Sequence, residues 1–359
     1  MNCIMARRRA HPGEVFMRKT GIVVFLCVLT SSLVAQQPKT NRAPLKAAEA
    51  PGLRLIQVIP FPDVVGRIDH LSADTSKRWV FVSALGSDTV EVVDGFAGRV
   101  IQTLTGLNRP QGVVWAPEVG KLYVANAGNG KLCVFTAPGF TLSQSIDFGE
   151  NADNLRYDAK TKRVYVAYGE DEHSGIGVVD AVTDERLEDA AKLGDHPESF
   201  QLEQNGNRIF ANMASSAQIA VVDRTSHRIG YWPLPGLKAN FPMALDEADH
   251  RLFVGTRTPP RFVALDTTTG KIVSTLPSAA DMDDVWYDTS RKRIYLSGAE
   301  GVISVVQQLA PDHYREASRV PSAVGARTSF WYPQRNRFYL AVPARADRGA
   351  ELYVYEGTE

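Results

Sequence analysis

Apolar and polar residues alternate along this chain in a pattern that repeats about every 43 residues. In six units a basic or polar residue precedes an apolar residue, an aromatic residue, and then an aliphatic residue or alanine, and a degenerate first copy has Trp79 in place of the polar residue. Lys121-Leu122-Tyr123-Val124 and Arg163-Val164-Tyr165-Val166 are two copies. The aromatic positions of the seven copies are Phe81, Tyr123, Tyr165, Phe210, Phe253, Tyr295 and Tyr339. Short segments that recur in this way predict β-strands in a repeat protein.

A second apolar segment follows each copy and ends, in its strongest forms, at an aspartate, as in Val92-Val93-Asp94 and Val178-Val179-Asp180. Glycine, serine, asparagine and aspartate lie between the two segments, as in 128–130, and these residues favour β-hairpin turns. An inner strand precedes each hairpin, and turns such as 268–271 lead into an outer strand. Each unit therefore predicts a four-stranded antiparallel sheet.

Four strands per unit, without helical periodicity, predict an all-β fold: a seven-bladed β-propeller of four-stranded blades over residues 53–359. The last unit ends near Glu356, whereas an apolar segment without a unit of its own, 53–59, precedes the first. We therefore predict that 53–59 is the outermost strand of the seventh blade. This N-terminal strand would close the ring and remove an exposed sheet edge.

Two sets of repeated residues are expected to hold the blades together. The seven aromatic residues are predicted to lie in the core rather than to form a sugar-stacking surface. The recurring basic residues are predicted to form salt bridges between blades with the acids that end the inner strands. These sets are Arg163, Arg208, Arg251, Arg293 and Arg337, and Asp158, Glu203, Asp246 and Asp288.

Residues 1–35 have the features of an export signal peptide. Arg18 and Lys19 precede the apolar run 21–29, and small residues lead to Ala35, where we expect cleavage. The run is shorter than the ~20 residues that span a bilayer, so we expect no membrane span in the mature chain. Residues 36–52 are expected to be a flexible linker, and the protein is expected to be periplasmic or secreted.

The charge balance argues against one class of partner. The chain has 40 basic and 40 acidic residues, and segment 1–35 holds five of the basic and one of the acidic ones, leaving a net charge of −4. Proteins that bind nucleic acids carry a basic excess or stripe, so we expect no nucleic-acid partner. Cys133 would be the one cysteine left after cleavage, and its apolar neighbours indicate a buried structural residue.

The hairpin motif resembles the YVTN-type repeat of secreted bacterial propellers of the YncE-like group, most clearly at Tyr123-Val124-Ala125-Asn126. The resemblance covers essentially all of 53–359 and implies the propeller fold. It leaves the function open, because related propellers include sugar lactonases, subunits of redox enzymes and proteins without known activity.

The starts of the inner strands predict where a site lies. Counting back five positions from the residue that ends each inner strand, Pro333 in the last blade, gives one residue per blade around the channel. This ring is Asp69, Gln111, Asp153, Glu198, Phe241, Asp283 and Thr328. With their neighbours, the predicted ligand-binding residues at the channel mouth are Arg67, Asp69, His70, Gln111, Asp153, Asn154, Arg156, His196, Glu198, Asp283 and Asp284.

Acidic side chains crowded at a channel mouth repel one another, by about 1 kcal/mol or more per pair in a partly desolvated site. A hard cation such as Ca²⁺ would offset this repulsion, because it binds carboxylate and amide oxygens. Its candidate ligands are Asp69, Asp153, Asn154, Glu198 and Asp283. If His70 and His196 point inward, a zinc-like or iron-like ion becomes an alternative. A third interpretation is a water-filled polar channel in which Arg67 and Arg156 neutralise the acids.

The sequence contains no hydrolase nucleophile elbow, haem-attachment motif or glycine-rich phosphate loop. The first functional hypothesis is therefore a monomeric binding or scaffold protein whose channel mouth takes a small molecule, a glycan or a protein. The second is a metal-dependent hydrolase of lactones or sugar esters, in which a metal ion polarises the ester carbonyl and activates water. A third, an electron-transfer subunit, has only the fold in its favour.

Overall fold

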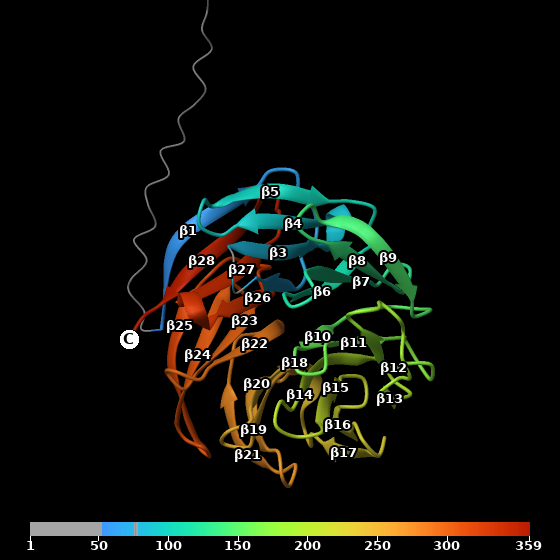
Figure 1. Cartoon of the computed structure of the whole chain (residues 1–359). Coiled ribbons are helices and arrows are strands. Elements are labelled where there is room, and N and C mark those ends of the chain that lie inside the picture. Colours follow the sequence, from blue (N-terminus) through green and yellow to red (C-terminus); the bar gives the residue numbers. More distant parts are fainter. Residues whose placement is uncertain (1–51, 75, 77) are drawn as a thin grey trace, which may run out of the picture. The chain divides into compact units, whose positions relative to one another are not determined.

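Seven antiparallel sheets of four strands each make up the described part of the chain, which comprises residues 52–74, 76 and 78–359 of the computed structural model. The sheets are arranged in a ring as the blades of a propeller (Figure 1), so the predicted fold is confirmed. The predicted leader, 1–35, and all of the predicted linker except Gly52 lie outside the described residues. No helix in the described ranges is both long enough and apolar enough to cross a membrane.

The strands follow the predicted order within each blade, from the innermost strand to the outermost. The first three blades are β2 (Leu71–Ala73), β3 (Trp79–Ala84), β4 (Thr89–Asp94), β5 (Arg99–Leu104); β6 (Pro110–Ala116), β7 (Lys121–Asn126), β8 (Lys131–Thr136), β9 (Thr141–Asp147); and β10 (Leu155–Asp158), β11 (Arg163–Tyr168), β12 (Gly175–Asp180), β13 (Ala191–Lys192).

The remaining blades have the same design, and the last one takes its outer strand from the N-terminal side. They are β14 (Pro197–Leu202), β15 (Arg208–Met213), β16 (Gln218–Asp223), β17 (Ile229–Pro233); β18 (Lys238–Asp246), β19 (Arg251–Thr258), β20 (Pro260–Asp266), β21 (Ile272–Pro277); β22 (Met282–Asp288), β23 (Arg293–Gly298), β24 (Val302–Ala310), β25 (His313–Pro321); and β26 (Ser329–Tyr332), β27 (Arg337–Val342), β28 (Ala350–Gly357), β1 (Leu53–Phe61).

The ring is closed by β1, which pairs antiparallel with β28 from Leu53 opposite Gly357 to Phe61 opposite Ala350. Arg54 reinforces this pairing through an ion pair with Glu356, at 2.6 Å between the guanidinium and a carboxylate oxygen. The predicted closure is therefore confirmed, with a strand two residues longer than expected. Figure 1 shows β1 in blue beside β28 in red, so the two ends of the propeller meet in one sheet.

The hydrophobic core lies between neighbouring blades. The seven repeat aromatics are all buried, as predicted. Phe81 of the first blade packs with Trp115 and Val124 of the second, while Tyr295 of the sixth packs with Phe338 of the seventh. Because each sheet buries both faces against its neighbours, the positions of the inner strands around the channel are tightly fixed.

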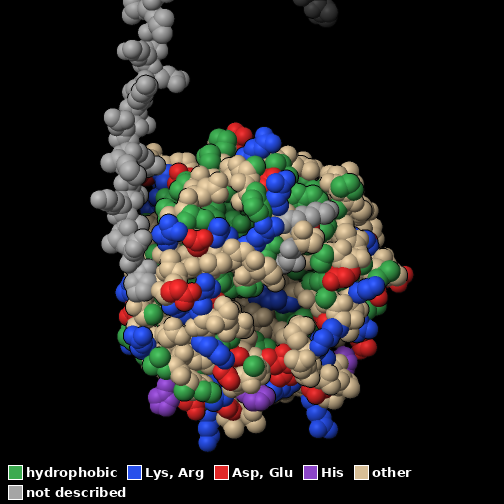
Figure 2. Space-filling model, turned by 60° about the vertical axis from the view of Figure 1, so that its left-hand side comes forward, with side chains coloured by type: hydrophobic (Ala, Val, Ile, Leu, Met, Phe, Trp, Pro, Cys, Tyr) green, Lys and Arg blue, Asp and Glu red, His purple; other side chains and the backbone are tan. Residues whose placement is uncertain are grey.

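The outer surface carries both charges. On the face that Figure 2 shows, Lys and Arg side chains are interspersed with Asp and Glu side chains, and neither sign forms a continuous area.

The predicted salt bridges between blades are mostly wrong. Arg208 pairs with Glu203 inside one blade, whereas Arg251 pairs with Asp266 and Asp312 instead of an inner-strand acid. The acids that end the inner strands mostly bind within their own turns, although Asp158 also pairs with Arg224 of the next blade at 3.4 Å. Asp288, for example, accepts a hydrogen bond from the backbone N–H two residues further on, at 3.0 Å, and so stabilises the tight turn.

Candidate functional site

The channel opens, where the inner strands begin, into a cavity of about 430 Å³. Figure 1 shows the inner strands β6, β10, β14, β18, β22 and β26 around the middle of the ring. Nine of the eleven predicted site residues line this mouth cavity: Arg67, Asp69, His70, Gln111, Asp153, Asn154, His196, Glu198 and Asp283. The other two, Arg156 and Asp284, line an adjoining cavity of about 320 Å³, which shares His70 and Asn154 with the first.

The last blade departs from the predicted ring by one residue. Tyr332 ends β26 in the same pairing position that Asp288 occupies at the end of β22. Counting back five residues from Tyr332, instead of from Pro333, places Arg327 in the ring. Arg327 indeed lines the mouth cavity, whereas the Thr328 hydroxyl is buried and donates to a backbone carbonyl. The ring therefore contains a cation among its acids.

Asp153, His196 and Glu198 form a compact group on one side of the mouth. One ligand atom from each residue lies within 4.8 Å of the other two. Asp153 precedes β10, while His196 and Glu198 flank the first residue of β14, so two neighbouring blades supply the group. Asp153 is 7 % exposed, and its Oδ1 is buried without a hydrogen-bond partner among the described residues. A buried carboxylate oxygen in this situation carries a desolvation cost that a bound cation would offset.

Both ring nitrogens of His196 face oxygen acceptors. Its Nδ1 contacts the backbone carbonyl of Gly169, and its Nε2 lies 3.3 Å from Asp153 Oδ2. Burial opposes the charged imidazole, but the hydrogen bond and charge of Asp153 outweigh burial and raise the pKa of His196 to about 9. Without a cation between the two side chains, Nε2 must carry a proton to face a carboxylate.

The pKa of Glu198 is also raised, but for a carboxyl group this favours the neutral form. Burial and the nearby charge of Asp153 raise the pKa of Glu198 to about 7. The site therefore holds two carboxylates and one imidazole close together, and a single imidazolium cannot neutralise both carboxylates.

Asp283 lies across the ring among arginines. Its Oδ1 is 2.5 Å from Arg257 Nη2, and its Oδ2 is 2.9 Å from Arg327 Nε and 3.7 Å from Arg67 Nη2. Burial alone would raise the pKa of Asp283, but the three guanidinium groups hold it below its usual value. This predicted metal ligand is therefore surrounded by the protein's own cations, which would repel a metal ion.

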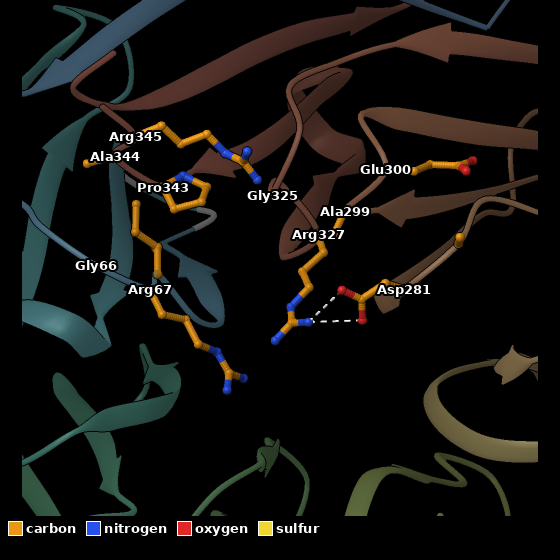
Figure 3. A pocket seen from close by; sticks show the side chains of 12 residues that line it. Gly66, Arg67, Asp281, Ala299, Glu300, Gly325, Arg327, Pro343, Ala344 and Arg345 are labelled. Atoms are coloured by element: carbon orange, nitrogen blue, oxygen red, sulfur yellow. Dashed lines mark hydrogen bonds and ion pairs between the residues drawn. The ribbon is translucent and has the colours of Figure 1, made fainter. Parts of the chain in front are cut away.

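The arginine cluster reaches outward into a third cavity, of about 710 Å³, shown in Figure 3. Arg327 binds both carboxylate oxygens of Asp281 there at 2.9 Å, and Arg67 and Arg345 extend from the other wall. Arg257 also lies over the Phe241 ring, with 3.6 Å between its guanidinium carbon and the ring centroid. The apolar ring member Phe241 thus supports the arginine that binds Asp283.

Asp69 and His70 link the mouth to the inner cavity. Arg67 Nη2 forms an ion pair with Asp69 Oδ2 at 2.8 Å. His70 lies between two carboxylates, with Nε2 3.5 Å from Asp69 Oδ1 and Nδ1 3.4 Å from Asp284 Oδ1. Burial works against a charged His70, but the two carboxylates raise its pKa to about 10. Burial raises the pKa of Asp69 to about 6, although His70 and Arg67 partly offset the shift. Asp69 is therefore occupied by internal partners.

Sequence reasoning placed the acids correctly at the mouth but missed two arginines that neutralise one of them. Arg257 lies near the end of β19, beyond the repeated motif, and no periodic signal marks it. Arg327 follows the register of the inner strands and was missed because of the one-residue slip in the last blade. The remaining predicted residue, Gln111, donates a 3.4 Å hydrogen bond to Asn151.

The solved structures that this chain resembles are propellers of distant sequence. One is a chain of the Kuenenia stuttgartiensis hydrazine synthase, with a TM-score of 0.70 and 16 % identity over 83 % of this chain and 96 % of that one. Another belongs to a crystal structure of a mitotic checkpoint complex, with a TM-score of 0.72 and 13 % identity over 93 % and 100 %. No protein-family model and no curated protein matches the sequence. At these identities the likeness shows the fold alone.

Proposed function

We propose that this protein is an exported binding module that holds a divalent metal ion at its channel mouth on Asp153, His196 and Glu198. The observation that carries this proposal is the close approach of the three ligand atoms, within 4.8 Å of one another, beside an unpartnered buried oxygen of Asp153. Export rests on the leader-like pattern of residues 1–35.

The donor set favours a transition-type ion over the Ca²⁺ that the sequence suggested. Ca²⁺ takes six to eight oxygen ligands, whereas this group offers one imidazole nitrogen and two carboxylates. Imidazole with carboxylates suits Zn²⁺, Mn²⁺ or Fe²⁺. Asp69 and Asp283, two further members of the predicted Ca²⁺ set, already have arginine partners.

Three protein ligands leave coordination positions open toward the mouth cavity. The volume of about 430 Å³ lies within the range of sites for small molecules. A small ligand with carboxylate, hydroxyl or carbonyl oxygens could bind the ion directly, while the arginine cluster beside Asp283 provides hydrogen-bond donors. The protein would thus present a metal ion on a rigid ring to a small oxygen-rich ligand.

Metal titration tests this proposal. Chelator-treated protein is titrated with Zn²⁺, Mn²⁺ and Ca²⁺ by calorimetry, alongside Asp153→Asn, Glu198→Gln and a control, Glu170→Gln. Glu170 lines the same cavity but lies outside the three-residue group, so its variant changes the mouth charge alone. We expect one Zn²⁺ or Mn²⁺ ion to bind per chain. Its affinity should be at least about tenfold lower in the first two variants and nearly unchanged in the control. Equal weakening in all three variants, or no binding, would contradict the proposal.

A metal-dependent hydrolase is the second candidate. The observation in its favour is that the group supplies three protein ligands, the number typical of catalytic zinc sites that keep a position for water or substrate. Hydrolysis of lactones or sugar esters by the metal-loaded protein, abolished by chelator and by Glu198→Gln, would support this reading. A metal-loaded protein that hydrolyses none of these substrates would leave binding as the function.

A further inference from the structure

Each inner strand has one residue at the position that pairs with the repeat aromatic, and most of these residues form the wall of the inner cavity. These partners are Ser72, Val114, Arg156, Gln201, Ala244, Trp286 and Phe330. Six of the seven, all but Ala244, line the cavity of about 320 Å³. Arg156 is the charged member of this layer, and it lies among aromatic, aliphatic and neutral polar side chains.

In one interpretation of the sequence Arg156 neutralises acids of the ring, but no carboxylate among the described residues forms an ion pair with it. Its Nη1 donates to Asn154 Oδ1 at 3.0 Å and to the Leu155 carbonyl at 2.7 Å, and its Nη2 donates to Ser199 Oγ at 3.2 Å. All three acceptors are neutral. Burial lowers the pKa of Arg156 to about 10, so the group is still a cation at neutral pH.

The guanidinium group is also incompletely used. Arginine has five N–H donors, and the three hydrogen bonds leave its Nε and one Nη2 hydrogen without an acceptor in the described residues. The group is held in place over the Phe200 ring, at 5.4 Å from its centroid. The charges of Asp284 and Asp153 act on Arg156, but neither carboxylate forms an ion pair with it. A positioned cation without a direct ion pair is costly in a desolvated channel, because buried charges are normally paired.

Asp284, the nearest acid lining this cavity, is occupied elsewhere. Its Oδ1 lies 3.4 Å from His70 Nδ1, and its Oδ2 accepts the backbone N–H of Ser329 at 2.7 Å. The cavity therefore contains a carboxylate in contact with its own cation and a guanidinium group that no carboxylate contacts directly. The unmatched charge in the inner cavity is positive.

The opposite side of the cavity is aromatic. Trp286 and Phe330 come from neighbouring blades and pack edge to face, with 5.0 Å between their ring centroids. Trp115 and Tyr157 also line the cavity. The Trp286 and Phe330 rings provide an apolar contact surface across the cavity from the free donors of Arg156, and this combination binds an organic acid with an apolar group.

We propose that the inner cavity binds a small monocarboxylate with an aromatic or branched apolar group. The carboxylate pairs with the free Nε and Nη2 donors of Arg156, and the apolar part packs against Trp286 and Phe330. Arginine suits this role because its planar fork matches a carboxylate in two parallel hydrogen bonds. This site does not depend on the metal ion at the mouth, because none of Asp153, His196 and Glu198 lines the inner cavity.

Benzoate and its uncharged analogue benzamide test the proposal on the full protein. Calorimetry, with the change in tryptophan fluorescence as a second readout, should show benzoate binding at least about tenfold more tightly than benzamide, since a charged hydrogen bond replaces a neutral one. Arg156→Gln should weaken benzoate binding at least tenfold, and Arg156→Lys should lie between Arg156→Gln and the unaltered protein. Arg109→Gln, which removes an arginine of the mouth cavity, should bind benzoate as the unaltered protein does.

The same titrations after chelator treatment separate this site from the metal site. Unchanged benzoate binding without metal supports the inner cavity. Binding that disappears with chelator but persists in Arg156→Gln places the carboxylate on the metal ion and overturns the inference, while the proposed function stands. Equal affinity for benzoate and benzamide overturns it as well. The inference is also overturned if none of benzoate, phenylacetate and 3-methylbutanoate binds at concentrations up to about 10 mM. The comparison between benzoate and benzamide needs no variant, so it holds even if Arg156→Gln is unstable.

Discussion

Ring closure by β1 can be tested by shortening one side chain. Ile59 is fully buried and packs with Val93 of the first blade and Leu352 of the seventh. Ile59→Ala removes three carbon atoms, which accounts for about 2.4 kcal/mol at about 0.8 kcal/mol each. The cavity left behind adds to this loss, so we expect the free energy of unfolding to fall by about 3 to 4 kcal/mol.

The next residue of the same strand provides the control. Val58 points outward and is 42 % exposed, so Val58→Ala should cost less than about 1 kcal/mol. Urea unfolding followed by circular dichroism gives both values, compared through the transition midpoints at a common slope. The contrast between the two variants separates burial in the seventh blade from a general effect of changing β1.

A small difference would refute the reasoning. If Ile59→Ala destabilises the protein by no more than about 0.5 kcal/mol beyond Val58→Ala, then β1 contributes little to the packed seventh blade. The ring would then be held by the face-to-face contacts of the other strands. If instead Ile59→Ala splits unfolding into two transitions, closure is what makes the blades unfold together.

Three further predictions follow from buried groups. Asp283→Asn removes the buried counter-charge of Arg257 and Arg327, which then keep only the half-exposed Asp281, and should lower the free energy of unfolding by about 3 kcal/mol. Asp281→Asn should cost less than about 1 kcal/mol, and equal losses in urea would contradict the arginine cluster. The pKa of His70 is raised to about 10, so its contribution to stability is complete below about pH 6.5 and is lost as the pH rises through 10. Melting temperatures of His70→Gln should therefore decline less between pH 7 and 10 than those of the unaltered protein, and parallel curves would refute this. Burial raises the pKa of the Cys133 thiol, so a thiol reagent should react with it only after unfolding in guanidinium, and rapid reaction of the native protein would show that the blade is open there.

The fold was predictable because each blade repeats the same local sequence pattern. The alternation of apolar residues selects strands, and the turn residues select hairpins. At Asp88 and Gly130 the turns adopt the positive φ angles, 56° and 64°, that aspartate and glycine tolerate better than most residues. The closing strand was predictable from a different argument, since a ring with one unit short of a strand has two exposed edges.

The candidate site was predictable in position but not in pairing. Equivalent register placed Asp69, Asp153, Glu198 and Asp283 around one opening, because the ends of the inner strands are fixed by the same sheet geometry. Which acid meets an arginine depends on side chains that the repeat does not constrain. Arg257, near the end of β19, forms an ion pair with Asp283, and no repeat in the sequence predicts this pairing.

The error in the last blade has a physical cause. The prediction ends the inner strand at Pro333, but proline has no N–H for the ladder, and it begins a short 3₁₀ turn instead. A shift of one residue moves a strand position to the other face of the sheet. The shift replaced Arg327 with Thr328 in the predicted ring and so hid one of the cations of the mouth.

In a repeat protein, a position that packing does not constrain is a good place to look for function. The position opposite each repeat aromatic faces the channel, and Val114, Ala244 and Phe330 occupy it in three blades, so blade packing does not require any particular side chain there. Packing therefore gives no reason for a charge at this position, and an unpaired cation costs free energy in a partly desolvated channel. Arg156 bears that cost at this layer, and the hydrogen bonds that it donates to neutral partners hold it in place. A bound carboxylate would offset this cost, which is why the inner cavity, as well as the more acidic mouth, should be tested for a ligand.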